Sequence, residues 1–297
     1  MKVRAPGKVV LSGAYAVLER APAMVAAVDR YVLADTARPP LLITPELQRA
    51  VGDRAPYVDV SALRSGDRKL GLGSSAAMVV AALAALSWTE HPELDNHAMA
   101  ERILPSAVRA HREAQGGGSG IDVATSAWGG TRVCWLDDGG KVLSRDIALA
   151  PGVRIEVYAS STASSTSEML ARVRAFARSN AAGYADLIAA LTDAARQAVK
   201  ATTLTGFQQA LREQVIGLSS LGDWASAPIV PEWLRELAGR AHAAGVVVMP
   251  SGAGGGDVVL SVGSDDACAS WRPSMEQAGL QRLELAVGAR GVHRLED

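Results

Sequence analysis

The sequence has little of several features that mark large classes of protein. Cysteine occurs only at Cys134 and Cys268, far apart and with no second metal ligand near either, so a zinc site or a disulfide framework is not expected. Cytoplasmic residence is the expectation for such a chain. The longest uncharged apolar run, 76–88, is too short to span a membrane. The opening residues MKVRAPGK lack the apolar core of a signal peptide, so none is expected.

An excess of charge of one sign is also absent. The formal net charge of the 297 residues is −1, with basic and acidic residues interleaved. We therefore expect no nucleic-acid partner and no membrane surface, although a local basic pocket is compatible with this balance. The length suffices for one large or two ordinary domains with full cores. We expect a monomer or a homodimer.

What the chain does contain is a glycine-rich stretch at 69–77, KLGLGSSAA, that runs into an apolar segment. This pattern predicts a tight loop followed by a buried helix over 74–88. Glycine allows close approach of the backbone to a ligand, and the unpaired N–H groups of a first helical turn favour an anion such as phosphate. Ser74 and Ser75 are able to cap the helix, or one hydroxyl to reach a phosphate-bound Mg²⁺. A glycine-serine turn that binds nothing is an equally simple interpretation.

Two other glycine motifs compete for this stretch. The chain has no G-x-x-x-x-G-K-[ST], so the loop is not a Walker motif. Gly71, Gly73 and Ala76 fit the G-x-G-x-x-A of dinucleotide-binding folds, with Glu93 about twenty residues further on. That motif requires a hydrophobic strand directly before it. The segment 61–69 is polar and charged, which disfavours this interpretation.

The first half of the chain reads as strands, two helices and a hairpin. The segment 36–68 is irregular and polar, so short strands and a loop are expected there, near the mouth of a nucleotide site. Pro105 predicts a kink or a break in the second helix. The expected elements are a strand at 2–12 interrupted at 5–7, strands at 15–18 and 24–34, helices at 74–88 and 96–115, and a hairpin of strands 131–136 and 141–144.

The expected domain boundary, at a Pro-Gly pair, divides the chain into 1–151 and 152–297. A long helical block follows the strand expected at 153–159, with breaks near Gly183 and Gly206. Apart from this insert, the second half reads β-α-β-β-α-β, the ferredoxin-like order of an α+β domain. The remaining expected elements are helices at 231–244 and 265–278 and strands at 246–249, 258–262 and 280–287.

Three glycine-bearing segments occur in the order APGKVVLSG, KLGLGSSAA and PSGAGGGD, at 5–13, 69–77 and 250–257. Together they closely resemble the three motifs of the GHMP small-molecule kinases, and the resemblance covers nearly the whole chain. It implies an α+β, two-domain GHMP kinase fold. The N-terminal α/β domain would carry the glycine-rich phosphate loop and bind ATP. The C-terminal domain would be ferredoxin-like with a helical insert.

The resemblance also implies roles for individual residues. The central motif would wrap the phosphates of ATP, Ser75 would help to hold Mg²⁺, and the third motif would support the phosphate loop. Lys8 and Asp122 would face the transferred phosphoryl group as the catalytic pair, although helix capping is the alternative for Asp122. The nucleotide residues so implied are Lys69, Gly71, Leu72, Gly73, Ser74, Ser75 and Ala76. Those implied for the acceptor are Lys8, Tyr15, Ser119, Gly120, Asp122, Ser165, Ser251, Gly252 and Ala253.

Within the superfamily, the details are most like the phosphomevalonate kinases. The triplet 13–15 resembles their glycine-tyrosine version of the first motif, and 115–124, QGGGSGIDVA, resembles their Q-G-K-x-G-S-G-F-D-V-A segment. The loop 162–166 resembles their P-A-S-T-S. This implies ATP-dependent phosphorylation of 5-phosphomevalonate to 5-diphosphomevalonate in the mevalonate pathway of isoprenoid synthesis. A mevalonate kinase, a homoserine or sugar kinase, and a catalytically inactive regulatory protein are the alternatives.

Some positions depart from that pattern. Gly117 stands where these kinases have a lysine, and Thr162 where they have a proline. In mevalonate kinases a Mg²⁺-binding Glu lies eleven residues before the catalytic Asp, and His111 occupies that position here. Glu113 is close in sequence, and the second metal ligand is left open.

A phosphate acceptor changes the demands on the site. Its second pKa is about 6, so near neutral pH it needs no strong base, but it does need cations to offset the repulsion between two anionic groups. We expect Lys8 and Lys69 to supply them, with Arg112 and Arg132 as weaker candidates. The serines and threonines of 160–166 are expected to bind a substrate carboxylate or phosphate, to cap the following helix, or to do both.

Overall fold

The computed structural model describes residues 1–66, 68–161 and 166–295. By its internal contacts the chain separates into two units, and each is described by itself. The first comprises Met1–Val9, Val25–Ile147 and Leu285–Asp297, and the second Val10–Met24 and Ala148–Glu284.

Both units are discontinuous, whereas the sequence suggested one division at 151/152. The segment Val10–Met24 belongs to the second unit because Tyr15 is buried in the hydrophobic core of that unit. The C-terminal segment returns to the first unit, where β12 (His293–Arg294) pairs antiparallel with β1 (Lys2–Ser12). The main crossing point is Ile147–Ala148, a few residues before the expected boundary.

The first unit is built on a sheet whose strands follow the order β12-β1-β2-β6-β7, with β3 paired to β2. The predicted hairpin is confirmed: β6 and β7 pair antiparallel, and the Asp137 carboxylate accepts the N–H of Lys141 at 2.8 Å in the turn. A separate short ladder joins β4 to β5. The bounds of the further strands are β2 Ala23–Asp35, β3 Tyr57–Asp59, β4 Arg64–Ser65, β5 Arg68–Lys69, β6 Thr131–Leu136 and β7 Val142–Asp146.

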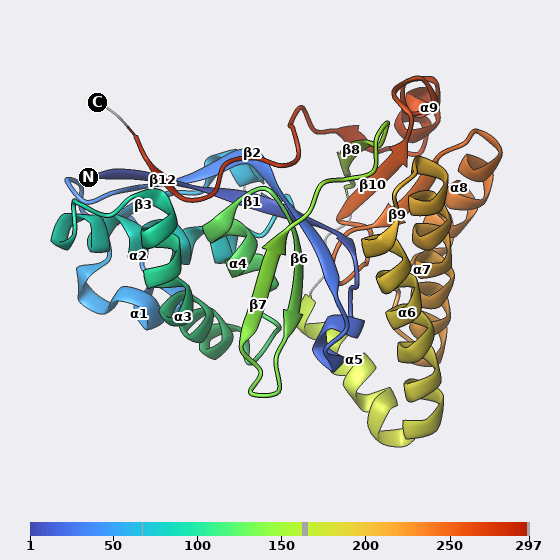
Figure 1. Ribbon diagram of the computed structural model, residues 1–297, viewed down its shortest axis with the longest axis horizontal. Coiled ribbons are helices and arrows are strands. Elements are labelled where there is room, and N and C mark those ends of the chain that lie inside the picture. Colours follow the sequence, from blue (N-terminus) through green and yellow to red (C-terminus); the bar gives the residue numbers. More distant parts are fainter. Residues whose placement is uncertain (67, 162–165, 296–297) are drawn as a thin grey trace. The chain divides into compact units, whose positions relative to one another are not determined.

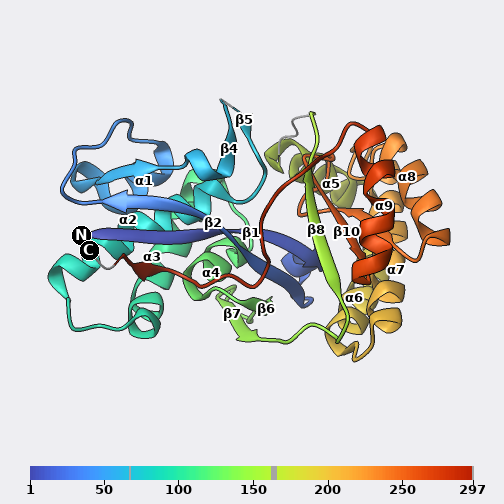
Figure 2. The ribbon, with the colours of Figure 1, turned by 90° about the horizontal axis from the view of Figure 1, so that it is seen from above.

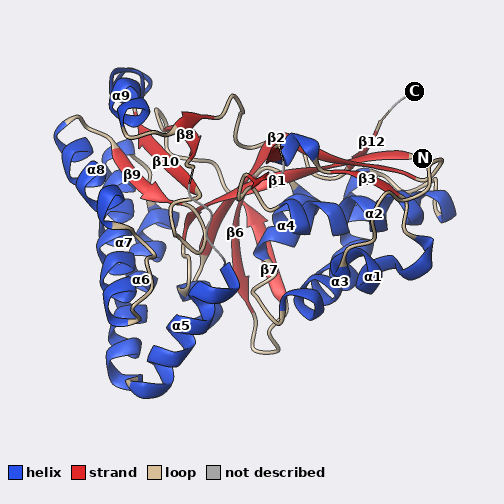
Figure 3. Ribbon diagram, turned by 180° about the vertical axis from the view of Figure 1, so that it is seen from behind, coloured by secondary structure: helices blue, strands red, loops and turns tan. Residues whose placement is uncertain are grey.

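Helices cover one face of this sheet, as Figures 1 and 3 show. α2 is buried on nearly all sides, which explains why its sequence is apolar without a polar face. α3 buries one face only and continues through Pro105, so the break considered at that proline is not observed. The helices are α1 Pro45–Val51, α2 Ser74–Glu90, α3 Asn96–Gln115 and α4 Ile121–Trp128, with short 3₁₀ turns at Gly52–Arg54 and Ser61–Leu63.

The second unit contains an antiparallel sheet in the order β11-β8-β10-β9. With the helical insert removed, this is the ferredoxin-like arrangement that the sequence predicted. Figure 2 shows α7, α8 and α9 on one side of the sheet. The elements are β8 Arg154–Ala159, α5 Thr166–Ser179, α6 Ala181–Lys200, α7 Leu204–Trp224, α8 Glu232–Ala243, β9 Val247–Pro250, β10 Val258–Gly263, α9 Asp265–Gln277 and β11 Gln281–Arg282.

The breaks predicted in the helical block are confirmed, and their cause is capping. Asn180 and Thr203 precede α6 and α7, and their side chains accept the N–H groups of Gly183 and Gly206. Such a cap satisfies a donor that the first helical turn leaves unpaired. The glycines therefore lie just inside the helices, and the breaks lie before them.

The strand predicted at 15–18 is wrong. Ala16–Glu19 forms a short 3₁₀ helix, η1, and Tyr15 precedes it with a φ of 63°. A positive φ is incompatible with an extended strand. The Tyr15 hydroxyl donates to the carbonyl of Ala253 at 2.6 Å, which anchors the ring in the second unit.

The interruption predicted in the first strand is also wrong, because β1 is continuous from Lys2 to Ser12. A Cβ on Gly7 would lie 2.7 Å from both the Leu63 side chain and the Leu72 carbonyl oxygen. Glycine at this position thus permits close packing within a strand and does not mark a turn.

The segment expected to be irregular, 36–68, contains the helix α1, which the sequence analysis missed. Thr44 caps it by accepting the N–H of Leu47, and Pro45 occupies its first position. Thr-Pro at a helix start is a recognisable signal, but a helix this short shows no apolar periodicity.

The strand predicted at 280–287 is shorter than expected. β11 ends at Arg282, and from Leu285 the chain belongs to the first unit, where the N–H of Ala286 donates to Asp29. In the part of the chain that the structure describes, none of the helices is long and apolar enough to cross a membrane.

Candidate active site

Lys8 and Asp122, the predicted catalytic pair, meet in the first unit. Nζ of Lys8 lies 3.2 Å from Oδ2 of Asp122. One turn further along α4, the Ser126 hydroxyl donates to the carbonyl of Pro6 at 2.8 Å. Residues four apart on a helix share a face, as do residues two apart on a strand, so these two contacts fix the register of α4 against β1. The Lys8 side chain is 9% exposed and that of Asp122 is 32% exposed, so the carboxylate is the more accessible partner.

The glycine loop packs directly on Lys8. The N–H of Lys8 donates to the carbonyl of Leu72 at 2.8 Å. Gly73 has a φ of 77°, and a Cβ there would lie 2.9 Å from Cε of Lys8. Both the left-handed conformation and the contact with Lys8 therefore require glycine.

Gly73, rather than either serine, is the N-cap of α2, so the capping role considered for Ser74 and Ser75 is wrong. No side chain in the described part of the chain caps this first turn. An uncapped helix start presents N–H donors and the positive end of the helix dipole, the combination that binds phosphate.

A carboxylate that the sequence analysis did not single out lies beside this helix start. The Ser75 hydroxyl donates to Oε1 of Glu46 at 2.9 Å, and Nε2 of Gln115 donates to the same oxygen at 2.8 Å. Glu46 is buried, with 8% of its surface exposed. Glu46 is the second residue of α1, so the Thr-Pro helix start is the signal that could have drawn attention to it.

The net effect of its surroundings is to lower the pKa of Glu46. Burial raises it, but hydrogen bonds from its own N–H, Ser75 and Thr44, together with the charge of Lys69, outweigh burial. Glu46 is therefore ionised at neutral pH. Lys69, one of the predicted phosphate-binding residues, is exposed at the end of β5.

His111, at the position of the expected metal-binding Glu, is half-buried. Burial lowers its pKa, the carboxylates of Asp122 and Glu46 raise it, and Lys8 lowers it, with a net downward shift. His111 is thus neutral at neutral pH and lies within electrostatic range of all three charged groups. Glu113, the other candidate, faces solvent and lies 3.7 Å from Arg49.

The predicted acceptor loop, 116–120, is held by an arginine. Nε of Arg112 donates to the carbonyl of Gly118 at 2.9 Å, and Nη2 donates to that of Ser119 at 2.6 Å. Gly120 caps α4 with a φ of 82°, and a Cβ there would lie 2.9 Å from Val108. Arg112 therefore fixes the loop that leads into Asp122. Arg132, the other arginine considered, is buried and pairs with Asp146 at 2.6 Å on the neighbouring strand.

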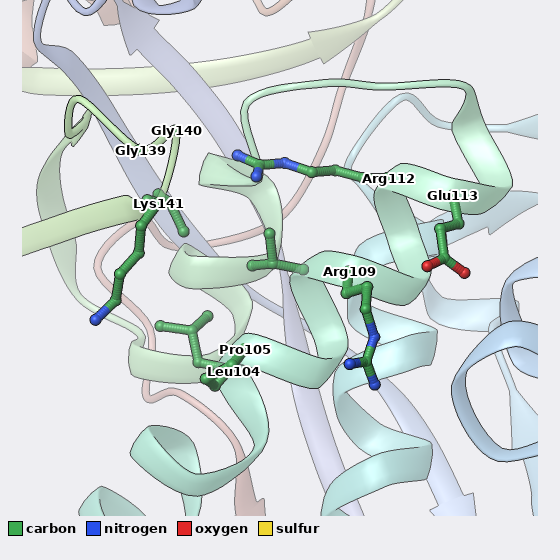
Figure 4. A pocket seen from close by; sticks show the side chains of 10 residues that line it. Leu104, Pro105, Arg109, Arg112, Glu113, Gly139, Gly140 and Lys141 are labelled. Atoms are coloured by element: carbon green, nitrogen blue, oxygen red, sulfur yellow. The ribbon is translucent and has the colours of Figure 1, made fainter.

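A pocket of about 370 Å³ lies beside Arg112, between α3 and the turn of the hairpin β6–β7. Figure 4 shows the Arg112 side chain reaching toward Gly139 and Gly140. The pocket combines an apolar wall with three cationic groups. Its lining is Leu104, Pro105, Val108, Arg109, Arg112, Glu113, Gly139, Gly140, Lys141 and Val142.

The remaining predicted residues lie in the second unit. The Ser251 hydroxyl accepts the N–H of Val10 at 2.8 Å and donates to the carbonyl of the same residue at 3.1 Å. Ala253 accepts the Tyr15 hydroxyl, and burial raises the pKa of that phenol. Gly252 has a φ of 71°. The first and third glycine motifs are thus joined through Val10 and Tyr15, and support of the phosphate loop by the third motif stays a prediction.

Ser165, and with it Thr162 and the rest of 162–165, lies outside the described residues. The residues that fit a magnesium ion are Ser75 and Glu46, because Mg²⁺ prefers oxygen ligands and takes few of them from the protein when it is bound with phosphates. No group of three or more His, Cys, Asp and Glu side chains able to hold a metal occurs among the described residues.

Comparison with known proteins agrees with this geometry. Residues 44–130 match the model described as the GHMP kinases N terminal domain. The match starts at the cap of α1 and extends past α4, so it includes Glu46, the glycine loop and Asp122. This chain therefore contains a GHMP kinase N-terminal domain. It also has the α+β fold of these kinases, as the following similarities show.

A phosphomevalonate kinase of Streptomyces sp. (strain CL190) is 26% identical to this chain, over 97% of each protein. A mevalonate kinase of Archaeoglobus fulgidus is 33% identical over a shorter region. That region makes up 46% of this chain and 52% of the mevalonate kinase, about half of each. The Streptococcus pneumoniae phosphomevalonate kinase in complex with phosphomevalonate and AMPPNP has the same fold. Its TM-score is 0.80 at 16% identity, covering 97% of this chain and 99% of the other.

Proposed function

We propose that this kinase transfers the γ-phosphoryl group of ATP to 5-phosphomevalonate, giving 5-diphosphomevalonate in the mevalonate pathway. The observation that carries the proposal is the Lys8–Asp122 pair beside the uncapped start of α2. The similarity to a phosphomevalonate kinase over nearly the whole length of both chains supports the choice of acceptor.

Each group has a defined task in this reaction. The N–H groups at the start of α2 bind nucleotide phosphates. The buried ammonium of Lys8 offsets negative charge that the donor and acceptor phosphates bring together. Asp122 holds Lys8 and orients the acceptor. Mg²⁺, held at Ser75, would neutralise charge on the nucleotide phosphates.

The covalent change is a single displacement. An oxygen of the acceptor phosphate forms a bond to the γ-phosphorus, and the bond from that phosphorus to the β–γ bridging oxygen breaks, releasing ADP. Because the acceptor is mostly a dianion near neutral pH, no strong base is needed. Positioning and charge neutralisation are then the main contributions of the protein.

Mevalonate is the second candidate acceptor, favoured by the 33% identity of about half of this chain to a mevalonate kinase. A hydroxyl acceptor must lose a proton. The accessible carboxylate of Asp122, 3.2 Å from Lys8, is then the candidate base.

Coupled ADP release with Mg-ATP tests the proposal, with 5-phosphomevalonate, mevalonate, homoserine and galactose in separate reactions. We expect turnover of about 1–100 per second with 5-phosphomevalonate. A clear preference for mevalonate would replace the acceptor and keep the kinase. If folded protein that binds ATP released no ADP with any of the four acceptors, the proposal would be contradicted.

A further inference from the structure

We propose that Glu46, on α1, is the carboxylate of the magnesium site and that it acts through the hydroxyl of Ser75. This inference rests on the proposed kinase function. It places the carboxylate on a different element from the one implied by the resemblance, where position 111 on α3 is a histidine.

The hydrogen bond between the two residues has the direction that a metal ligand needs. A hydroxyl has one proton and two lone pairs, and an ionised carboxylate only accepts. When Ser75 donates its proton to Oε1 of Glu46, as observed at 2.9 Å, the lone pairs of the Ser75 oxygen face away from the carboxylate. One of them accepts from Nε2 of Gln115 at 3.4 Å, and the other stays available for a cation. Glu46 thus sets the orientation of Ser75 and adds negative charge beside it.

Glu46 is also held in place more firmly than a surface carboxylate. Nε2 of Gln115 donates to Oε1 at 2.8 Å and lies 3.4 Å from the Ser75 oxygen. The three side chains come from α1, α2 and α3, and Glu46 itself is 8% exposed. A pre-positioned carboxylate and hydroxyl bind a metal with little reorganisation.

The other nearby candidates do not meet these requirements. His111 is neutral at neutral pH and feels the positive charge of Lys8, and magnesium prefers oxygen to imidazole ligands. The side chain of Glu113 is 47% exposed and is paired with Arg49. Glu46 is the carboxylate that is both buried and bonded to the predicted metal-binding serine.

The test measures AMPPNP binding by isothermal titration calorimetry, once with Mg²⁺ and once with EDTA. The variants are Glu46→Gln, which keeps the size of the side chain and removes its charge, and the matched control Glu113→Gln. In the wild-type protein, we expect Mg²⁺ to tighten AMPPNP binding. In Glu46→Gln, we expect at least about a tenfold loss of that gain, with the affinity in EDTA changed less than about twofold. The control should keep the whole gain.

Ser75→Ala provides a second, independent variant. It should lose a similar part of the magnesium-dependent gain, and the double variant should lose little more than either single variant, because both act on one ion. Electron paramagnetic resonance of Mn²⁺ with AMPPNP should show weaker Mn²⁺ binding in the same variants. Thermal unfolding measures whether each variant is folded.

A full magnesium-dependent gain in folded Glu46→Gln would overturn the inference. So would an equal loss of affinity with Mg²⁺ and with EDTA, because a purely structural carboxylate would act without the metal. Failure of the proposed function looks different: wild-type protein would then bind AMPPNP with its magnesium-dependent gain and yet release no ADP with any of the four acceptors.

Discussion

Each unit contains a carboxylate held by cations, and the two differ in how fully they are bonded. In the second unit, Glu156 is 3% exposed and accepts hydrogen bonds from Tyr158 at 2.7 Å and from Nε of Arg272 at 2.9 Å, with Arg282 at 3.6 Å. In the first unit, Asp122 has a single ion-pair partner within the described chain, Lys8 at 3.2 Å.

This difference separates a carboxylate that holds the fold from one that is available for chemistry. The oxygens of Glu156 are occupied by groups from α9 and from β8 itself, and any ligand would have to displace them. Asp122 is partly exposed, lies at the start of a helix and faces one lysine, so it can exchange a contact for one with substrate. The number of hydrogen-bond and ion-pair partners in the fold therefore distinguishes two carboxylates that look equally charged in the sequence.

The strongest test of the comparison is Asp122→Asn. We expect turnover in the ADP-release assay to fall by about 10²–10⁴-fold, because the orienting charge is lost. The variant should remain folded, with some loss of stability because the buried Lys8 ammonium loses its ion-pair partner. A folded variant with near-normal turnover would contradict its catalytic role.

Lys8→Met should have the next largest effect. Removing the ammonium leaves charge on the phosphates uncompensated, and we expect turnover to fall by about 10²–10³-fold. The methionine keeps an apolar stem against Gly73, so circular dichroism and thermal unfolding should show a folded protein. Arg145→Met, an exposed cation on β7, is the control and should keep its activity.

Glu156→Gln should show the reverse pattern. It removes the buried negative charge that Arg272 and Arg282 share, and we expect the free energy of unfolding to fall by about 1–3 kcal/mol, reduced by the partial exposure of both arginines. Urea unfolding measures this loss. The turnover of the folded variant should stay within about threefold of the wild type. A loss of turnover as large as that of Asp122→Asn would remove the distinction between the two carboxylates.

The smallest expected effect concerns acid. Burial raises the pKa of Glu156. Hydrogen bonds from Arg272 and Tyr158 and the charges of both arginines lower that pKa by more, so the net shift is downward. A carboxyl group with a lower pKa in the folded chain stabilises the fold above its unfolded pKa, about 4.3. That contribution is lost as the pH falls through the folded pKa. Urea titrations from neutral pH to below about pH 4 should show the difference between wild type and Glu156→Gln shrinking.

Much of this molecule could be predicted from local patterns. The Asp-Asp-Gly-Gly turn at 137–140, the proline and glycine that bound the helix near 231–244, and the glycines of 69–77 each specify their elements within a few residues. The errors arose where a tertiary contact overrides the local pattern. Tyr15 adopts a positive φ because its ring belongs to the core of the second unit, and Gly7 packs against Leu72 inside a strand.

The meeting of Lys8 and Asp122 was expected only from the resemblance to the GHMP kinases. The sequence by itself determined the three glycine motifs and the ferredoxin-like order. It did so because turn chemistry, periodicity and motif spacing are short-range properties. Only the tertiary structure decided which glutamate meets Ser75, since Glu46 lies 29 residues from that serine and 69 from Gln115. Helix packing brings these side chains together, and packing depends on surfaces that no single stretch of the chain contains.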